Sequence, residues 1–154
     1  MLKVSKQTDY GILLLTAIVS SRDEGSLSAR ELSEMTHLPL PMVGKILKVL
    51  SREEILESQR GAKGGYSLAR PADEITLIDL VRAIEGPVAI TECIETPGEC
   101  RHENNCPVQV NWLNINRLIR EALKGITLLD MTRPNQLHQL SDGSQKKEPV
   151  GLSS

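Results

Sequence analysis

A proline-rich break between two short helical patterns is the feature that most limits what this chain can fold into. The break, His37–Pro41, reads HLPLP, and its prolines remove backbone donors and prevent one helix from running through. Before it, Ser28 and Glu31 have the spacing of a capping box, which satisfies free N–H groups at a helix start. After it, Pro41 has the fixed φ that suits the first position of a new helix. The pattern predicts two helices joined by a short turn.

The helix after this break is predicted to have one buried face and one basic face. Its apolar residues fall at offsets of zero, three, four and seven, which places them on a single stripe, namely Val43, Ile46, Leu47 and Leu50. The opposite face carries Gly44, Lys45, Lys48 and Arg52. A helix that packs with one side and offers lysines on the other is typical of the second helix of a DNA-binding helix-turn-helix.

Two short strand candidates follow, Ile55–Gln59 and Tyr66–Ala69, joined by the glycine-rich turn RGAKGG. Such a turn lets the backbone approach a phosphate closely, and a long cation at its tip can enter a minor groove. An ordinary solvated hairpin is the alternative, and its position after a helix-turn-helix favours a basic β-wing. The predicted DNA-binding residues are therefore Ser28, Pro41, Met42, Gly44, Lys45, Lys48, Arg52, Arg60 and Lys63.

The composition favours a mainly α fold with this small β-wing. Among 154 residues there are one tryptophan, two tyrosines and no phenylalanine, so the core must be aliphatic, whereas strand-rich domains contain more aromatic residues. The net charge of -2 argues against a general polyanion binder. However, residues 1–70 carry ten Lys/Arg against eight Asp/Glu, and residues 71–154 carry eight against twelve. The basic excess lies in the half that contains the helix-turn-helix.

Further helices are predicted on both sides of this unit. One runs from a Thr8 cap to Ser21, another from a Thr76 cap to Gly86, and a short turn follows a Thr127 cap. Pro107 opens the longest helix, which ends near Lys124. Its apolar seam needs a cover, and an identical partner helix in a homodimer is the simplest one, with packing onto its own domain as the alternative. The seam consists of Val108, Trp112, Ile115, Ile119 and Ala122 or Leu123.

The sequence predicts a cytoplasmic protein that does not contact the membrane. No secretory signal is visible at the start. The longest apolar run, Ile12–Leu15, falls far short of the roughly twenty residues that a membrane span needs. In that reducing compartment, three cysteines within fourteen residues suit a metal better than a disulfide.

The three cysteines, Cys93, Cys100 and Cys106, lie in a segment without periodicity before Pro107. Their spacing, C-x6-C-x5-C, matches neither zinc knuckles nor the ferredoxin run. Three thiolates so close together suit an iron-sulfur cluster, and zinc held by the same thiolates plus His102 fits equally well. A catalytic cysteine is disfavoured because no motif places a base beside it, so no enzyme is predicted.

Three stretches of the chain carry a resemblance to a known family. They are Thr8–Tyr10, the wing segment Arg60–Tyr66, and the three cysteines before the long helix. From Leu2 to Leu129 the chain resembles the bacterial Rrf2 family of winged-helix regulators. The resemblance implies a homodimer on a palindromic operator in double-stranded DNA. It also implies an iron-sulfur cluster on the cysteines, with [2Fe-2S] favoured over [4Fe-4S] and zinc as the alternative.

The resemblance leaves the fourth ligand open. Where the IscR branch of the family has a histidine three residues after the third cysteine, this sequence has Gln109. Asp9 matches the aspartate that the NsrR branch donates from the partner's first helix, and His102 is the local alternative. The stretch Lys6–Gly11 is similar to regulators of the SUF cluster-assembly operon. It implies a repressor of such genes that senses cluster status, iron, or oxidative or nitrosative stress.

The sequence therefore predicts four segments. Residues 1–72 form the winged helix-turn-helix, residues 73–106 the linking helix and cysteine loop, residues 107–133 the dimerisation helix and a terminal turn, and residues 134–154 a disordered polar tail.

Overall fold

The structure, a computed structural model, describes residues 3–21, 25–62 and 64–133. These residues form seven α-helices, a 3-10 turn and a two-stranded antiparallel sheet, so the prediction of a mainly α fold with a small wing is confirmed. In chain order the elements are α1 (Lys6–Ser20), α2 (Ala29–Thr36), α3 (Leu40–Arg52), β1 (Leu56–Gln59), β2 (Gly65–Leu68), α4 (Leu77–Glu85), α5 (Glu92–Glu95), η1 (Glu103–Asn105), α6 (Gln109–Lys124) and α7 (Leu128–Met131).

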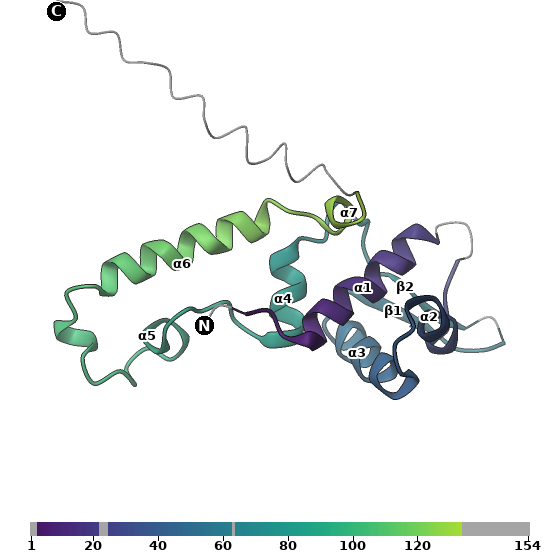
Figure 1. The fold of residues 1–154 in the computed structure, drawn as a ribbon, viewed down its shortest axis with the longest axis horizontal. Coiled ribbons are helices and arrows are strands. Elements are labelled where there is room, and N and C mark those ends of the chain that lie inside the picture. Colours follow the sequence, from purple (N-terminus) through teal and green to yellow (C-terminus); the bar gives the residue numbers. More distant parts are fainter. Residues whose placement is uncertain (1–2, 22–24, 63, 134–154) are drawn as a thin grey trace, which may run out of the picture.

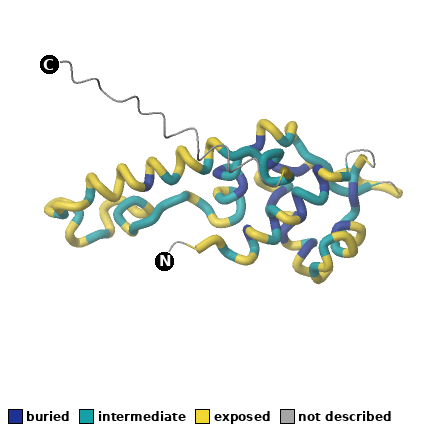
Figure 2. Tube along the Cα trace, turned by 45° about the horizontal axis from the view of Figure 1, so that its top comes forward, coloured by how far each residue is buried: buried dark blue, intermediate teal, exposed yellow. Residues whose placement is uncertain are grey.

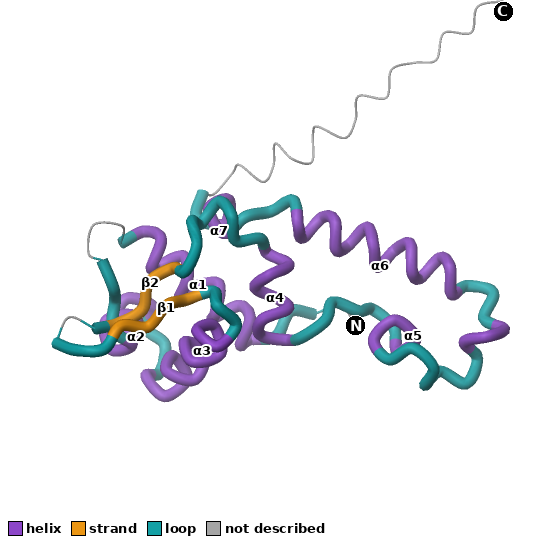
Figure 3. The backbone as a smooth tube through the Cα atoms, turned by 180° about the vertical axis from the view of Figure 1, so that it is seen from behind, coloured by secondary structure: helices purple, strands orange, loops and turns teal. Residues whose placement is uncertain are grey.

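The elements divide into a packed head and an extended arm (Figure 1). The head consists of α1 to α4, the sheet and α7, which gather around one another. The arm is residues 88–125, in which the segment that contains α5 leaves the head and α6 returns beside it. Seen from behind, the sheet lies at the end of the head that is opposite to the arm (Figure 3). The wing and the cysteine segment therefore lie at opposite ends of the molecule.

The hydrophobic core lies entirely in the head (Figure 2). As predicted, it is aliphatic, and Tyr10 and Tyr66 only pack against its edge. Its fully buried members come from α1, α2, α3, α4, α7 and the segment before α4, and they are Leu14, Leu15, Leu32, Val43, Ile46, Leu47, Leu50, Ile75, Leu80 and Leu128. Because α7 belongs to this core, the chain end of the arm is anchored back on the head.

Paired hydrogen bonds fix the return of the arm to the head. Leu77 N–H donates to the Ile126 carbonyl over 2.8 Å, and Leu128 N–H donates to the Ile75 carbonyl over 2.8 Å. Thr76 and Thr127 lie opposite each other in this bridge. Each caps its own helix, as the sequence predicts, and in the structure each cap is part of a capping box, with Asp79 and Asp130 respectively. The chain that leaves the arm is thus held on the head at the start of α4.

Several predicted helix limits are wrong. Ser5, not Thr8, caps α1, and Thr8 is instead fully buried, where its hydroxyl donates to the Glu85 carboxylate. The long helix begins at Gln109 rather than at Pro107. In α4 the buried residues are Ile78 and Leu80, and Leu77 and Ile84 pack against the core.

Two further expectations need smaller corrections. Helix α3 starts at Leu40, which puts Pro41 at its second position. The segment between α4 and α6, predicted to be a plain loop, contains the single helical turn α5 and the 3-10 turn η1. The tail from residue 134 onward lies outside the described residues.

Candidate nucleic-acid interface and cysteine arm

Helices α2 and α3 form the predicted helix-turn-helix. The capping box at the start of α2 is present, with Ser28 N–H donating to the Glu31 carboxylate over 2.7 Å and Glu31 N–H donating to the Ser28 hydroxyl over 3.2 Å. The hydrogen bond from the Ser28 backbone holds the pKa of Glu31 below its usual range. Helix α2 ends at Thr36, and the next residue, His37, has a left-handed φ of 57° that turns the chain into α3. The turn therefore fixes how α3 is presented.

Helix α3 buries the predicted stripe and leaves its other face uncovered. Val43, Ile46, Leu47 and Leu50 are almost inaccessible to solvent. On the other side, Lys45 and Lys48 are exposed, and in the described part of the chain no carboxylate pairs with either of them. Arg52 contacts Glu53 over 3.6 Å, a surface ion pair that contributes little to stability. The uncovered face is thus basic and available to a polyanion.

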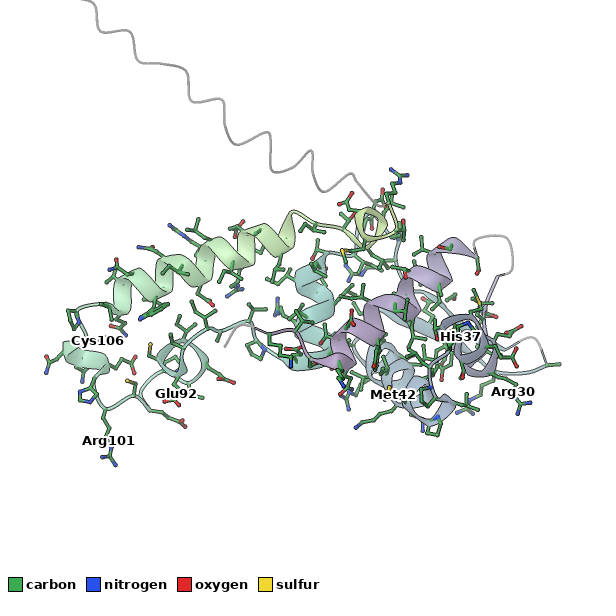
Figure 4. All side chains as sticks on the ribbon, in the orientation of Figure 1. Arg30, His37, Met42, Glu92, Arg101 and Cys106 are labelled. Atoms are coloured by element: carbon green, nitrogen blue, oxygen red, sulfur yellow. The ribbon has the colours of Figure 1, made fainter. Side chains whose placement is uncertain are left out.

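The N-terminal end of α3 is exposed and apolar. Leu40 and Met42 are 41% and 38% accessible, and Pro41 is exposed between them. Figure 4 shows Met42 at the edge of the head, and Arg30 at the same edge on α2. Arg30 is an exposed cation at the start of α2 that the sequence analysis did not single out, because it lies outside the helical stripe patterns.

The hairpin of β1 and β2 is tied to the start of α2. Leu27 and Tyr66 exchange backbone hydrogen bonds of 3.0 and 2.7 Å. Gly65 makes this approach feasible, because a Cβ there would lie 2.5 Å from the Leu27 carbonyl. At the tip, Gly61 has a φ of 115° and Gly64 N–H donates to its carbonyl. Arg60 is exposed at this tip, and Lys63 lies outside the described residues. The hairpin is thus the wing that the sequence predicts.

The three cysteines are distributed along the arm. Cys93 lies in α5, with its sulfur 3.1 Å from the Thr91 hydroxyl. Cys100 lies in the following turn, and Cys106 ends η1 at the tip of the arm (Figure 4). All three are free thiols and half-buried. Thiols are the ligands that iron-sulfur clusters prefer, and these three would supply all but one of the four that a cluster needs. However, among the described residues no three His, Cys, Asp or Glu side chains are gathered closely enough to hold a metal ion.

The proposed fourth ligands occupy different parts of the chain. Asp9 is exposed on α1, in the head, and does not form a ligand group with the cysteines of its own chain. His102 is exposed just before η1, and Gln109 is the half-buried first residue of α6. Among the described residues, neither Asp9 nor His102 forms a ligand group with the thiols.

Three hydrogen bonds hold the chain where the arm begins. Asn116 is the one buried residue of α6, with 4% of its surface accessible, and its side-chain amide donates to the Val88 carbonyl over 3.2 Å. At the end of α4, Glu85 accepts hydrogen bonds from the Thr8 hydroxyl and from Ser5 N–H at the start of α1. Burial raises the pKa of Glu85, but these hydrogen bonds outweigh it and hold the pKa below its usual value. The start of the arm is thus held from two sides, by α1 through Glu85 and by α6 through Asn116.

The apolar seam of α6 is only partly covered by its own chain. Ile119 and Leu123 are half-buried, and α6 packs against α4. The rest of the helix exposes an unusual amount of apolar surface, on Val108, Val110, Trp112, Leu113, Ile115 and Leu118. Figure 2 shows this contrast with the buried head.

A helix-turn-helix with a basic outer face, followed by a hairpin tied back to its first helix, defines a winged-helix DNA-binding protein. The family model described as "Rrf2: Iron-dependent Transcriptional regulator" matches residues 4–134. The chain therefore belongs to the Rrf2 family and is a transcriptional regulator rather than an enzyme.

Relatives and solved structures agree with this assignment. The HTH-type transcriptional regulator CymR of Bacillus subtilis is 26% identical, over 94% of this chain and 96% of CymR. Protein aau3 of Rhizobium meliloti is 31% identical over 86% of each chain. The structure of B. subtilis CymR, described as the global cysteine regulator, superposes with a TM-score of 0.68 at 26% identity, covering 86% of this chain and 97% of CymR. The structure of T. potens IscR has a TM-score of 0.63 at 27% identity, covering 97% and 94%.

In the described part of the chain, every helix is too short or too polar to cross a membrane.

Proposed function

We propose that this Rrf2-family regulator is a homodimeric repressor whose binding to a palindromic operator depends on an iron-sulfur cluster at Cys93, Cys100 and Cys106. The observation that carries the proposal is the set of three free, half-buried thiols on an arm that is joined directly to an uncovered apolar helix. The description of the family as iron-dependent and the likeness to IscR support it. We favour a [2Fe-2S] over a [4Fe-4S] cluster, and genes of SUF-type cluster assembly as the target.

The ligand set that we propose consists of the three thiols and one further group. Asp9 of the partner subunit is the favoured fourth ligand, because it matches the aspartate that the NsrR branch donates across the dimer. Asp9 of the same chain lies in the head and forms no ligand group with the cysteines. His102 and Gln109 are the alternatives on the arm itself. Since the thiols do not form a ligand group in this structure, we expect the segment from Cys93 to Cys106 to change conformation when it binds the cluster, so that the three sulfur atoms come together. When bound, such a cluster supplies a centre that responds to iron supply and to oxidative or nitrosative stress.

Dimer formation follows from the exposed face of α6. Burying one large apolar side chain contributes about 1.5–3 kcal/mol, and Trp112, Ile115 and Leu118 are 41%, 40% and 66% accessible in the single chain. A second copy of α6 covers an identical face by two-fold symmetry. A dimer of this kind offers two α3 helices to two half-sites spaced by roughly 34 Å, one turn of DNA.

The chain's own contacts provide a route from the arm to the head. Glu85 holds the start of α1, and only Gly86 and Pro87 separate it from Val88, whose carbonyl is held by Asn116 of α6. A change in the conformation of the cysteine segment therefore acts on a point that is fixed both to α1 and to the dimerisation helix. We expect such a change to alter the spacing of the two α3 helices, and with it the affinity for the operator.

Anaerobic purification tests the cofactor. The full-length protein is isolated without oxygen, and its visible absorption, iron, acid-labile sulfide and zinc are measured. We expect a coloured protein with iron and sulfide in equal amounts, and loss of both in the triple variant Cys93→Ser, Cys100→Ser, Cys106→Ser. A colourless protein that contains zinc contradicts the proposal and favours a zinc-stabilised DNA- or protein-binding module.

The fourth ligand is tested by the same absorption spectrum. We expect Asp9→Ala to shift the visible bands of the cluster, while His102→Ala and Gln109→Ala leave them unchanged. A shift in either of the last two variants alone assigns the ligand to the arm.

A further inference from the structure

Gly44, in the middle of α3, is a glycine that the fold itself does not require. A Cβ at this position would meet no atom within 4 Å, and its φ is not positive. Gly11 of α1 is different, because a Cβ there would lie 2.6 Å from the Ile84 side chain. Glycine in a helix interior destabilises the helix relative to alanine. Packing within the head therefore does not explain why position 44 is a glycine.

The neighbours of Gly44 on the helix surface face the proposed DNA. Residues four apart lie on the same side of a helix, so Leu40 precedes Gly44 and Lys48 follows it. Leu40 is an exposed apolar side chain, with 41% of its surface accessible. Lys48 is exposed and, in the described part of the chain, has no carboxylate partner. Gly44 thus leaves an open position between an apolar group and a cation.

The chemistry of the major groove indicates what occupies this position. Thymine is the base that presents a methyl group there, and proteins recognise that group by apolar contact. A helix without a side chain at the contact point approaches the base more closely. The adjacent Lys48 has the charge to neutralise a phosphate, which holds the helix in the groove.

We propose that Gly44 determines part of the operator specificity, by admitting the 5-methyl group of a thymine against Leu40. The inference rests on the binding of DNA by α3 and does not depend on the cluster. It predicts that the protein prefers operators with a thymine opposite Gly44 in each half-site.

The test begins with the wild-type holoprotein. Its preferred duplex is selected from a random library under anaerobic conditions, and each thymine of the half-site is then replaced in turn by deoxyuridine, which lacks the 5-methyl group. We expect one replacement to weaken wild-type binding by about fivefold or more, as for the loss of one base contact. A wild-type protein that selects no sequence contradicts DNA recognition by α3 itself.

Gly44→Ala then separates this contact from a structural role. We expect the variant to have a higher melting temperature, because alanine is the better helix former, and a lower affinity for the selected duplex, by about fivefold or more. On the duplex with deoxyuridine at the critical position, the variant is expected to regain affinity, because the methyl group added to the protein replaces the one removed from DNA.

Gly125→Ala is the matched control. Gly125 ends α6 with a negative φ of -74°, and a Cβ there would lie 3.5 Å from its nearest neighbour, an ordinary contact. We expect this variant to bind both duplexes as the wild type does. If Gly44→Ala binds the selected duplex like the wild type, or if no replacement of thymine restores its affinity, the proposed thymine contact is wrong.

Discussion

Lys48 carries the residue-scale test of the recognition face. It is exposed on α3, beside Lys45, and its charge has no carboxylate partner in the described chain. We expect Lys48→Ala to weaken operator binding by about 1–3 kcal/mol if the lysine contacts a base. If it contacts a phosphate, the salt dependence should fall by about one unit of slope. Fluorescence anisotropy at several salt concentrations measures both quantities.

Lys124→Ala is the control, because Lys124 lies on the arm and pairs with Glu121 over 3.1 Å. It should leave both affinity and salt slope as in the wild type. If Lys48→Ala also leaves them unchanged, α3 is not the DNA-reading helix.

Glu85 gives the head a dependence on pH. Burial raises the pKa of its carboxyl, and the stronger combined effect of the Thr8 and Ser5 hydrogen bonds holds it below the usual value. A carboxylate whose pKa is lowered by folding stabilises the native state above its unfolded pKa, about 4.3 for glutamate. That stability is lost as the pH falls through the lower folded value.

Glu85→Gln is therefore expected to lower the melting temperature at neutral pH. It should also make the melting temperature decrease less between neutral and acid pH than it does in the wild type. Thermal unfolding followed by circular dichroism measures both. Glu57→Gln, on the exposed surface of β1, should match the wild type. A Glu85→Gln protein whose pH profile coincides with that of the wild type would show that the link between α1 and α4 contributes no pH dependence.

At the scale of elements, the parts of the fold that depend on local signals could be predicted from the sequence. The capping box at Ser28, the caps at Thr76 and Thr127, the break before α3 and the glycine-rich wing turn all depend on residues within a few positions of one another. The buried stripe of α3 follows in the same way from its helical period. All of these are present in the structure.

The features that were predicted wrongly or not at all depend on contacts between distant parts of the chain. Thr8 is a good capping residue by type, but its hydroxyl is used by Glu85, 77 positions away, and Ser5 caps α1 in its place. Likewise, the base of the arm is held by Asn116 and Val88, 28 positions apart. No short-range pattern in the sequence indicates either contact. The candidate site shows the same limit, since the cysteine spacing suggests ligands but does not fix how the arm folds around them.

At the scale of the whole molecule, the distribution of charge along the chain follows its division into head and arm. The half of the chain with the basic excess forms the helix-turn-helix and wing, whereas the arm carries the acidic residues Glu92, Glu95, Glu99 and Glu103. The cysteine segment of the arm is therefore acidic, with Arg101 as its one Lys/Arg. An acidic segment is repelled by DNA phosphate, so the charge pattern favours contact through the head and regulation through the cysteine segment.

The proposed dimer is tested on the uncovered side of α6. Ile115 and Leu118 are neighbours on this side and are 40% and 66% accessible. We expect the double variant Ile115→Glu, Leu118→Glu to sediment as a monomer with an unchanged helical circular dichroism spectrum, because neither side chain is buried in the single chain. Met35→Glu, an exposed apolar position on α2 that is 45% accessible, should remain a dimer. A double variant that stays dimeric would place the subunit interface elsewhere.

The central claim is that the state of the cysteine arm controls the affinity of the head for DNA. Its most direct test is the operator affinity of one anaerobic preparation, measured before and after the cluster is removed with a chelator, beside the triple Cys→Ser variant. The account predicts a change of tenfold or more on removal, about 1.4 kcal/mol, and an affinity of the variant equal to that of the cluster-free protein. Equal affinities for all three samples, with every protein folded, would contradict it.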